Sequence, residues 1–414
     1  MYGSPSGFRA ETSVFCHFRT SAGVIVFTGV SDELSTSLAA AVGISLVSLE
    51  NLNSEKAISK AAAQLQEESL RRYGSFRTPL DAALQDAFYA AGKEDIRAEN
   101  ARLRQHDMRR ITRLTPRMKE LLENAYQDAS GDLLNLTRTT VSTSQSLFIE
   151  AANRAFLQVK SGSASYTDAL TEAVKSAARQ GTTVLYDAAG PTQLDVAMRR
   201  AVLTGVNQAA ASVTLAYADE VECDYVETTA HAGARPTHVL WQGQVFCISG
   251  RDTGYRKFAE ATGYGKVDGL CGANCRHNFY MFWPGISVPV YTQEQLQAYT
   301  AASIPWQGQM LTEAEARAMQ RAREVRIRES KRTLAVLDAA AQSTNDAALK
   351  AALQAEFAKE ARLLDRRQAS LQEFCAATKR RMDTARTQVH AITAPDGRII
   401  SFDRALARKA ADVV

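Results

Sequence analysis

Glycine, cysteine, histidine and tryptophan are concentrated in one short part of the chain, residues 223–290. This part holds nine of the 23 glycines, four of the six cysteines, three of the six histidines and two of the three tryptophans. Frequent glycine favours tight turns and irregular backbone over long helices. The sequence therefore predicts one compact α+β module within a mainly helical chain, and sites built from loops are expected in this module.

Apolar residues recur at steps of three and four on both sides of the module, as on one face of a helix. This pattern predicts a helical domain over residues 51–222 and, after the module, a C-terminal helical hairpin and tail over residues 291–414. Within the hairpin, Thr312–Leu337 and Ala347–Arg381 are long enough to pack against each other as antiparallel helices.

The first 50 residues differ from the helical part that follows. Ser13–Arg19 and Gly23–Gly29 are short, rich in β-branched or aromatic residues, and punctuated by serine and glycine. Such segments are typical of short strands, so residues 1–50 are predicted to form a small mixed or β segment with a hairpin.

Several shorter elements are also predicted. Pro191-Thr192 is expected to open an alanine-rich helix, with Asp195 as a partner resembling that of a capping box. Small side chains on this helix would allow another helix to approach closely. Short strands are expected at Cys223–Thr228, Gln244–Ile248, His277–Trp283 and Arg398–Phe402.

Composition excludes several classes of protein. The apolar stretch near Ala22–Leu49 is interrupted by Asp32 and Glu33, and the N-terminus lacks the pattern of a secretory leader, so neither membrane insertion nor export is expected. Six cysteines in 414 residues do not make a disulfide scaffold and indicate a reducing compartment. The net charge is +4, and residues 309–414 hold 20 basic and 14 acidic side chains. That surplus suits a polyanion, an acidic protein surface or a solvated helix face.

The densest candidate chemistry is a possible metal site. Cys271 and Cys275, followed by His277, combine with the distant His238 or His231 to give four ligands suited to tetrahedral zinc. The alternative is that both cysteines are small buried hydrophobic residues and that the histidines and Arg235 bond to loop carbonyls. Zinc is the only cofactor that the sequence suggests.

Two further hypotheses concern catalysis and DNA. Either cysteine, paired with a histidine, would form a nucleophile for acyl transfer, but no protease or hydrolase signature surrounds them. Arginines 317, 321, 326 and 328 on the first hairpin helix would meet DNA phosphates, yet glutamates are interleaved with them. A solvated face, or a docking face for an acidic protein, is therefore favoured over DNA binding.

Five separated segments carry a resemblance to a known family. They are Asp195–Gln208, His231–Gly243, Cys271–His277, the arginine-rich Arg321–Arg332, and Glu373-Phe374-Cys375. In this order they resemble the minor capsid protein 2 family of tailed phages. The resemblance extends from about Asp128 to Arg386 and leaves residues 1–50 outside.

The resemblance implies a function. The family is similar in its central module to head-morphogenesis minor head proteins, which associate with the portal vertex inside the head. It implies a structural, non-enzymatic virion protein of a tailed phage or prophage, acting in head assembly or DNA delivery and assembled in the host cytoplasm. The implied partners are the portal protein, the major capsid protein and further copies of the chain. The alternatives are a DNA-binding packaging or ejection protein, and a metal- or Cys/His-dependent enzyme.

The resemblance also bears on the metal hypothesis. Many of those minor head proteins carry a Cys-x-x-Cys and a Cys-x-Cys word. In this chain Arg235 and His238 stand in place of the first pair, and Cys275 and His277 in place of the second. One implied ligand is therefore an arginine, and Cys271 is the replacement that the sequence offers.

Overall fold

Helices form most of the structure. The computed structural model describes residues 22–49, 55–104, 108–181, 183–186, 190–389, 392–393, 399–401 and 403–414. The helices are α2 (Ala22–Val47), α3 (Glu55–Arg104), α4 (Pro116–Lys160), α5 (Tyr166–Gln180), α6 (Leu194–Glu220), α7 (Pro236–Val239), α8 (Phe258–Thr262), α9 (Gln293–Thr300), α10 (Glu313–Ser343), α11 (Ala347–Ala377) and α12 (Asp403–Ala411), with a 3-10 turn at Thr384–Thr387.

The strands are short and pair in antiparallel fashion. They are β1 (Thr183–Tyr186) with β2 (Gly190–Gln193); β4 (Val245–Cys247), β3 (Tyr225–Thr228) and β5 (Phe279–Met281) in that spatial order; β6 (Ile304–Trp306) with β7 (Gln309–Leu311); and β8 (Ile392–Thr393) with β9 (Ile399–Ser401). The mainly helical fold with one small α+β module is confirmed, as are the strands predicted within the module and near the C-terminus.

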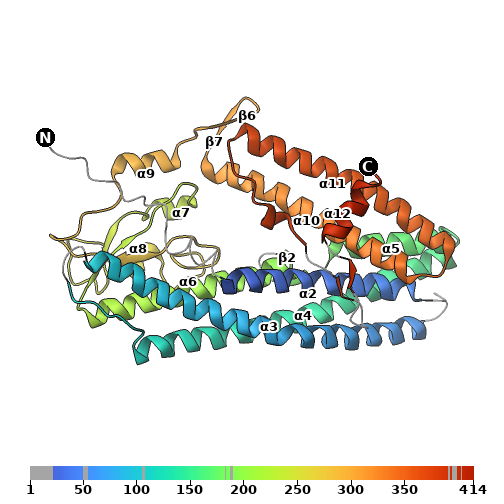
Figure 1. Ribbon diagram of the computed structural model, residues 1–414, viewed down its shortest axis with the longest axis horizontal. Helices are drawn as coiled ribbons and strands as arrows, with labels where there is room; N and C mark the ends of the chain where they lie inside the picture. Colours follow the sequence, from blue (N-terminus) through green and yellow to red (C-terminus); the bar gives the residue numbers. More distant parts are fainter. Residues whose placement is uncertain are drawn as a thin grey trace.

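The long helices and the module occupy different parts of the molecule (Figure 1). Helices α2, α3, α4 and α6 run side by side along the long axis, and the α10–α11 hairpin crosses above them. The module with α7 and α8 lies at one end of this assembly, beyond the hairpin. Within the described ranges, no helix has both the length and the apolar composition that a bilayer span requires.

Local chemistry explains where several helices begin. The Thr115 hydroxyl accepts a hydrogen bond from the Met118 N–H, and Pro116 occupies the first turn of α4. Thr312 and Glu315 form a reciprocal capping box at the start of α10. The Asp346 carboxylate caps α11, only three residues after α10 ends. Such a short connection makes α10 and α11 an antiparallel hairpin, which confirms the predicted one.

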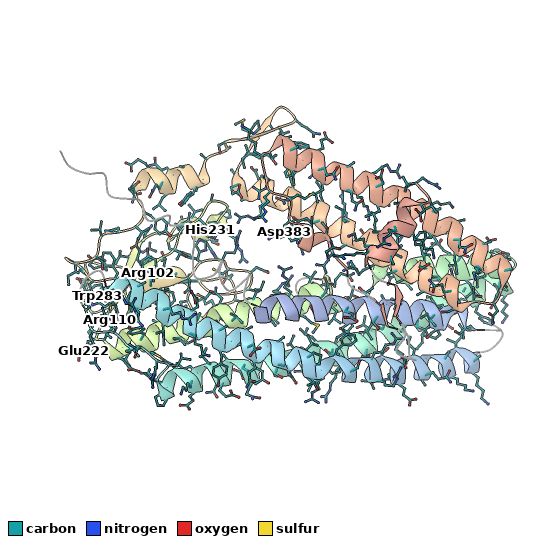
Figure 2. The ribbon with its side chains drawn as sticks, viewed as in Figure 1. Arg102, Arg110, Glu222, His231, Trp283 and Asp383 are labelled. Carbon is teal, nitrogen blue, oxygen red and sulfur yellow. The ribbon has the colours of Figure 1, made fainter. Side chains whose placement is uncertain are left out.

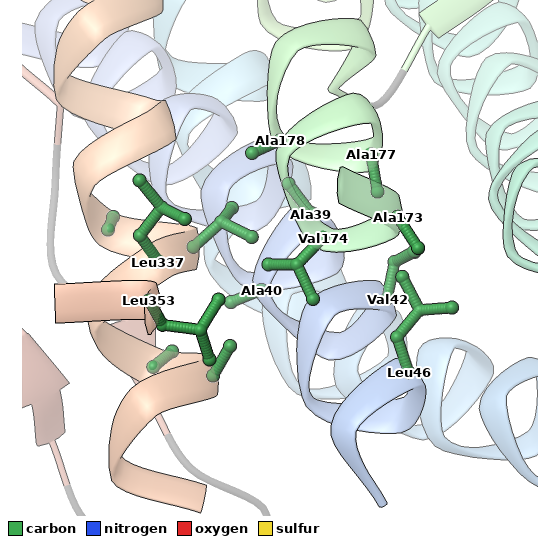
Figure 3. Packing of buried hydrophobic residues seen from close by; sticks show 14 of the residues in the cluster. Ala39, Ala40, Val42, Leu46, Ala173, Val174, Ala177, Ala178, Leu337 and Leu353 are labelled. Carbon is green, nitrogen blue, oxygen red and sulfur yellow. The ribbon is translucent and has the colours of Figure 1, made fainter. Parts of the chain in front are cut away.

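Alanine and glycine allow the long helices to pack closely. Figure 3 shows alanines of α2 and α5 interleaved with larger apolar side chains, including Leu337 of α10 and Leu353 of α11. A Cβ added at Gly43 of α2 would lie 2.8 Å from Val336 Cγ1 of α10. On α6, a Cβ added at Gly205 would lie 3.0 Å from the ring of Phe88 on α3. The prediction that small residues on α6 admit another helix is confirmed.

The strand predicted at Gly23–Gly29 is wrong, because these residues belong to α2. The C-terminal half of α2 is buried around most of its circumference, from Leu34 to Leu46. A helix that is buried on all sides shows no amphipathic periodicity, so its serines and glycines resemble the punctuation of strands. The other predicted strand, Ser13–Arg19, lies outside the described residues.

The helix start predicted at Pro191-Thr192 is also wrong. Both residues belong to β2, and α6 begins at Leu194 without a side-chain cap. Asp195 is instead 2% exposed and accepts hydrogen bonds from the guanidinium groups of Arg328 and Arg332 on α10. The carboxylate therefore joins two helices that are far apart in the sequence.

The solvated face predicted for the arginine-rich helix is wrong for these two arginines. Arg328 and Arg332 are both buried. Burial of a guanidinium requires a carboxylate or several acceptors nearby, and Asp195 provides the carboxylate. Arg326, in contrast, is exposed.

We predict that Asp195→Asn lowers the free energy of unfolding by about 3–5 kcal/mol, because it removes a buried negative charge that accepts hydrogen bonds from two buried guanidinium groups. The matched control is Asp219→Asn, which breaks the ion pair between Arg117 and Asp219. The side chains of this pair are 60% and 68% exposed, respectively. An exposed pair contributes about 0–1 kcal/mol, so the control should change little. Denaturant unfolding of the three proteins checks this, and equal small losses in both variants would contradict it.

Candidate metal centre

The module is built on the sheet β4-β3-β5, which packs against α6. Val226 of β3 pairs with Phe246 of β4 and Met281 of β5, so it occupies the centre of the sheet. Aromatic and sulfur-containing side chains from β4, β5, α8 and the surrounding loops form a small apolar core: Trp241, Phe246, Phe258, Cys271, Cys275 and Phe279. Candidate ligands therefore lie inside a core rather than on a surface.

The loop that carries both cysteines is tightly folded. A Cβ added at Gly269 would collide with the carbonyl oxygen of Gly263, so glycine is required at this close approach. Cys271 and Asn274 adopt left-handed backbone conformations, with φ of 59° and 57°. These turns bring Cys275 and His277 close to His238 of α7.

Three predicted ligands converge in this structure: His238 from α7, and Cys275 and His277 from the loop before β5. The two Nδ1 atoms lie 3.3 Å apart. The Sγ atom of Cys275 lies 3.8 Å from Nδ1 of His238 and 3.7 Å from Nδ1 of His277. All three side chains are buried. Their donor atoms thus form a compact triangle that is able to hold one metal ion.

The outer nitrogens of both imidazoles face carbonyl oxygens. Nε2 of His238 lies 2.9 Å from the backbone oxygen of Asp268, and Nε2 of His277 lies 3.0 Å from Oε1 of Gln242. The same Oε1 accepts the backbone N–H of His231 at 3.2 Å, which fixes the orientation of the amide. Nothing in the local sequence pattern distinguishes Gln242 from a surface residue, so the sequence did not indicate this role.

The other residues that the sequence suggested for the site lie nearby but make different contacts. The Cys271 thiol donates to the backbone oxygen of His277, at 3.7 Å, and is not a member of the ligand triangle. His231 stacks on His277 with ring centroids 4.2 Å apart. Arg235 donates to the carbonyl oxygen of Ala273. The structure thus brings three of the four predicted ligands together and places the fourth beside them.

Burial governs the protonation of the cluster. Loss of solvent lowers the pKa of His238, lowers that of His277 further, and brings that of His231 to about 4. The same effect raises the pKa of both Cys271 and Cys275. At neutral pH the imidazoles are therefore neutral and the thiols protonated, whereas a cysteine nucleophile requires a lowered pKa and access to substrate.

A second feature is a basic cleft of about 620 Å³ between the module and the C-terminal hairpin. Its basic lining residues are Arg276, Arg317, Lys379, Arg380, Arg381 and Arg386, and its acidic ones are Glu313 and Asp383. In Figure 2, Asp383 on the segment after α11 lies beside the part of the module that carries His231. The cleft is suited to an anionic group.

Several arginines of the cleft already have partners. Arg317 donates to the backbone oxygen of Ala232 at 3.1 Å and pairs with Glu313. Arg380 contacts the same glutamate at 2.6 Å. Lys379 and Arg381 are exposed and extend the basic lining toward solvent. The cleft is therefore partly neutralised by the chain itself.

Comparison with known proteins gives one result. The sequence model of a family described as phage minor capsid protein 2 matches residues 48–376. This range includes the ligand triangle and the whole module. No curated protein and no solved structure shows significant similarity to the chain.

The module also contains a buried carboxylate, Glu227 on β3. Its Oε1 accepts the backbone N–H of Val290 at 2.8 Å, and its side chain is inaccessible to solvent. Burial raises the pKa of this carboxyl to about 7. Arg102, at the end of α3 (Figure 2), lies over the neighbouring Tyr280 ring and only partly offsets this effect.

We predict that Glu227→Gln becomes more stable than the wild type as pH rises. The raised pKa means that the carboxyl stays protonated in the folded protein between pH 4.5 and about 7 while it ionises in the unfolded chain. The contribution of Glu227 to the free energy of unfolding is therefore complete below pH 4.5 and falls by about 3 kcal/mol as the pH rises to about 7. Glutamine resembles the protonated carboxyl at every pH, so the variant does not lose this contribution.

Unfolding by denaturant at several pH values checks this prediction. Glu260→Gln, which changes an exposed carboxylate of the same module, is the control and should track the wild type. A difference between Glu227→Gln and the wild type that does not vary from pH 4.5 to 8 would contradict the prediction.

Proposed function

Because the chain belongs to the phage minor capsid protein 2 family, we propose that it is a structural head protein of a tailed phage or prophage, located at the portal vertex or inside the capsid. Its role there is in head assembly or DNA delivery, and it is incorporated into virions assembled in the host cytoplasm. The observation that carries this proposal is the family match over residues 48–376, which spans the helices from α3 to α11 together with the module.

The form of the molecule supports a docking role. With 50 residues in α3 and 45 in α4, these helices are about 75 Å and 68 Å long at 1.5 Å per residue. Such rods present extended surfaces to neighbouring subunits. On the module, Ile286, Val288 and Val290 expose 50%, 82% and 45% of their surface within one short segment. Clustered apolar exposure of this kind favours a protein partner, for which we propose the portal protein, the major capsid protein or another copy of the chain.

The properties of the buried cysteines argue against an enzyme. Both thiols of the module lie inside an apolar core with a raised pKa, far from the conditions of a nucleophile. We therefore propose a structural protein without catalytic activity, in keeping with its family.

A second candidate function is DNA contact during packaging or ejection, and the basic cleft is the observation in its favour. Against this function, Arg328 and Arg332 form ion pairs with Asp195, and Arg317 donates a hydrogen bond to a backbone oxygen of the module. Fewer free cations remain than the sequence suggests. Docking of an acidic segment of a partner protein in the cleft is accordingly the favoured role.

We predict that the protein is present in purified mature particles. Quantitative mass spectrometry of nuclease-treated, density-purified heads should detect it reproducibly. Abundant host proteins in the same sample provide the contamination control. Consistent absence from mature heads would refute a virion role and leave only a transient role in assembly.

We predict little duplex DNA binding at physiological salt. If the arginines of α10 and the cleft met phosphates, the logarithm of the binding constant would fall with log salt by about 0.9 per neutralised phosphate. Fluorescence anisotropy across a salt series, with Lys379→Ala/Arg381→Ala as the test variant, measures this slope. Tight binding with a slope of several units, reduced in the variant, would overturn the ranking and favour the DNA function.

A further inference from the structure

We propose that His238, Cys275 and His277 bind one zinc ion, with Nδ1, Sγ and Nδ1 as its three protein ligands and with Cys271 outside the coordination sphere. This proposal concerns the chemistry of the module and holds or fails independently of the proposed role in the virion. Three observations carry it: the spacing of the donor atoms, the hydrogen bonds of the outer nitrogens, and the position of the fourth candidate.

The spacing matches the edges of a tetrahedron. Zinc binds nitrogen at about 2.0–2.1 Å and sulfur at about 2.3 Å, so tetrahedral angles give about 3.4 Å between two nitrogens and about 3.6 Å between nitrogen and sulfur. The corresponding distances here are 3.3 Å, 3.7 Å and 3.8 Å. One zinc ion would satisfy all three without a large movement of any side chain.

The hydrogen bonds fix both imidazoles in the form that binds metal. A carbonyl oxygen only accepts, so Nε2 of His238 facing Asp268 and Nε2 of His277 facing Gln242 must each carry a hydrogen. In a neutral imidazole the other nitrogen, Nδ1, then presents a lone pair. The two lone pairs face each other across 3.3 Å, an arrangement that is repulsive unless a positive charge lies between them. Oxygen acceptors behind metal-binding histidines are the usual outer partners of zinc ligands.

A metal-free cluster accounts for these contacts less well. The Cys275 thiol carries one hydrogen and is able to donate it to one nitrogen only. The second Nδ1 would stay unsatisfied among buried side chains, which is costly in a low-dielectric core. A zinc ion with a thiolate ligand removes this deficit.

The fourth position on the zinc ion is not supplied by the other side chains that the sequence suggests. His231 lies outside the ligand triangle, with its Nδ1 3.0 Å from the backbone oxygen of Ala232. Arg235 carries only donors and is directed to the Ala273 carbonyl, so it does not ligate. The Cys271 thiol is directed to the backbone oxygen of His277. A water molecule is the simplest fourth ligand. The ion would then cross-link α7 and the loop before β5, and the free energy of metal binding would stabilise the folded module.

The first experiment uses the full-length wild-type protein. After loading with zinc and removal of excess metal, elemental analysis should find one zinc per chain. X-ray absorption at the zinc edge should show one sulfur and three lighter nitrogen or oxygen neighbours. No retained zinc would overturn the proposal, and two sulfur neighbours would overturn the three-ligand assignment, because Cys271 would then be a ligand.

The second experiment uses variants and cobalt(II) as a probe. The thiolate-to-cobalt absorption band should be lost in Cys275→Ser and retained in Cys271→Ser, with Cys247→Ser as a control for a buried cysteine outside the cluster. Gln242→Met should weaken zinc binding by about 10–100-fold, since it removes the acceptor that orients His277. Loss of the cobalt band in Cys271→Ser would refute the three-ligand assignment. If Cys275→Ser does not fold, the X-ray absorption data of the wild-type protein decide how many sulfur atoms bind the metal.

Discussion

The arrangement of the long helices depends on the contact between the buried carboxylate of Asp195 and two arginines of α10. The carboxylate lies at the start of α6 and meets two guanidinium groups of α10, which is more than 130 residues further along the chain. Charged groups that are buried together favour the geometry in which they are paired, because separating them inside a low dielectric costs free energy. Since α6 also supports the sheet of the module, this contact fixes the C-terminal hairpin relative to the helices below it and to the candidate metal centre at their end.

Close packing of small residues completes this arrangement. Helix α2 lies in the main core against α3, α5 and α10, and Gly43 admits the side chain of Val336. The family match begins at residue 48, just after α2 ends. The core of this protein is therefore completed by a segment outside the region that defines its family, and packing rather than family membership explains why α2 is helical.

The same burial that stabilises the module shapes its chemistry. Inside an apolar core the histidines stay neutral and keep a lone pair for a cation, while the raised pKa of the thiols opposes nucleophilic attack. Two of the arginines that suggested a nucleic-acid surface are likewise bonded within the chain, Arg328 to Asp195 and Arg317 to the backbone oxygen of Ala232. Both effects favour a structural protein whose buried charged groups contribute to the fold.

The sequence by itself determined the class of fold, the α10–α11 hairpin and the short strands of the module. These follow from periodicity, turn residues and short spacings, which are local properties of the chain. Only the tertiary structure decided that Gly23–Gly29 is helical, that Asp195 binds arginines of α10 and that Gln242 orients His277. Each of these depends on which distant segments surround a residue, because burial sets both the cost of a charge and the periodicity that a helix displays.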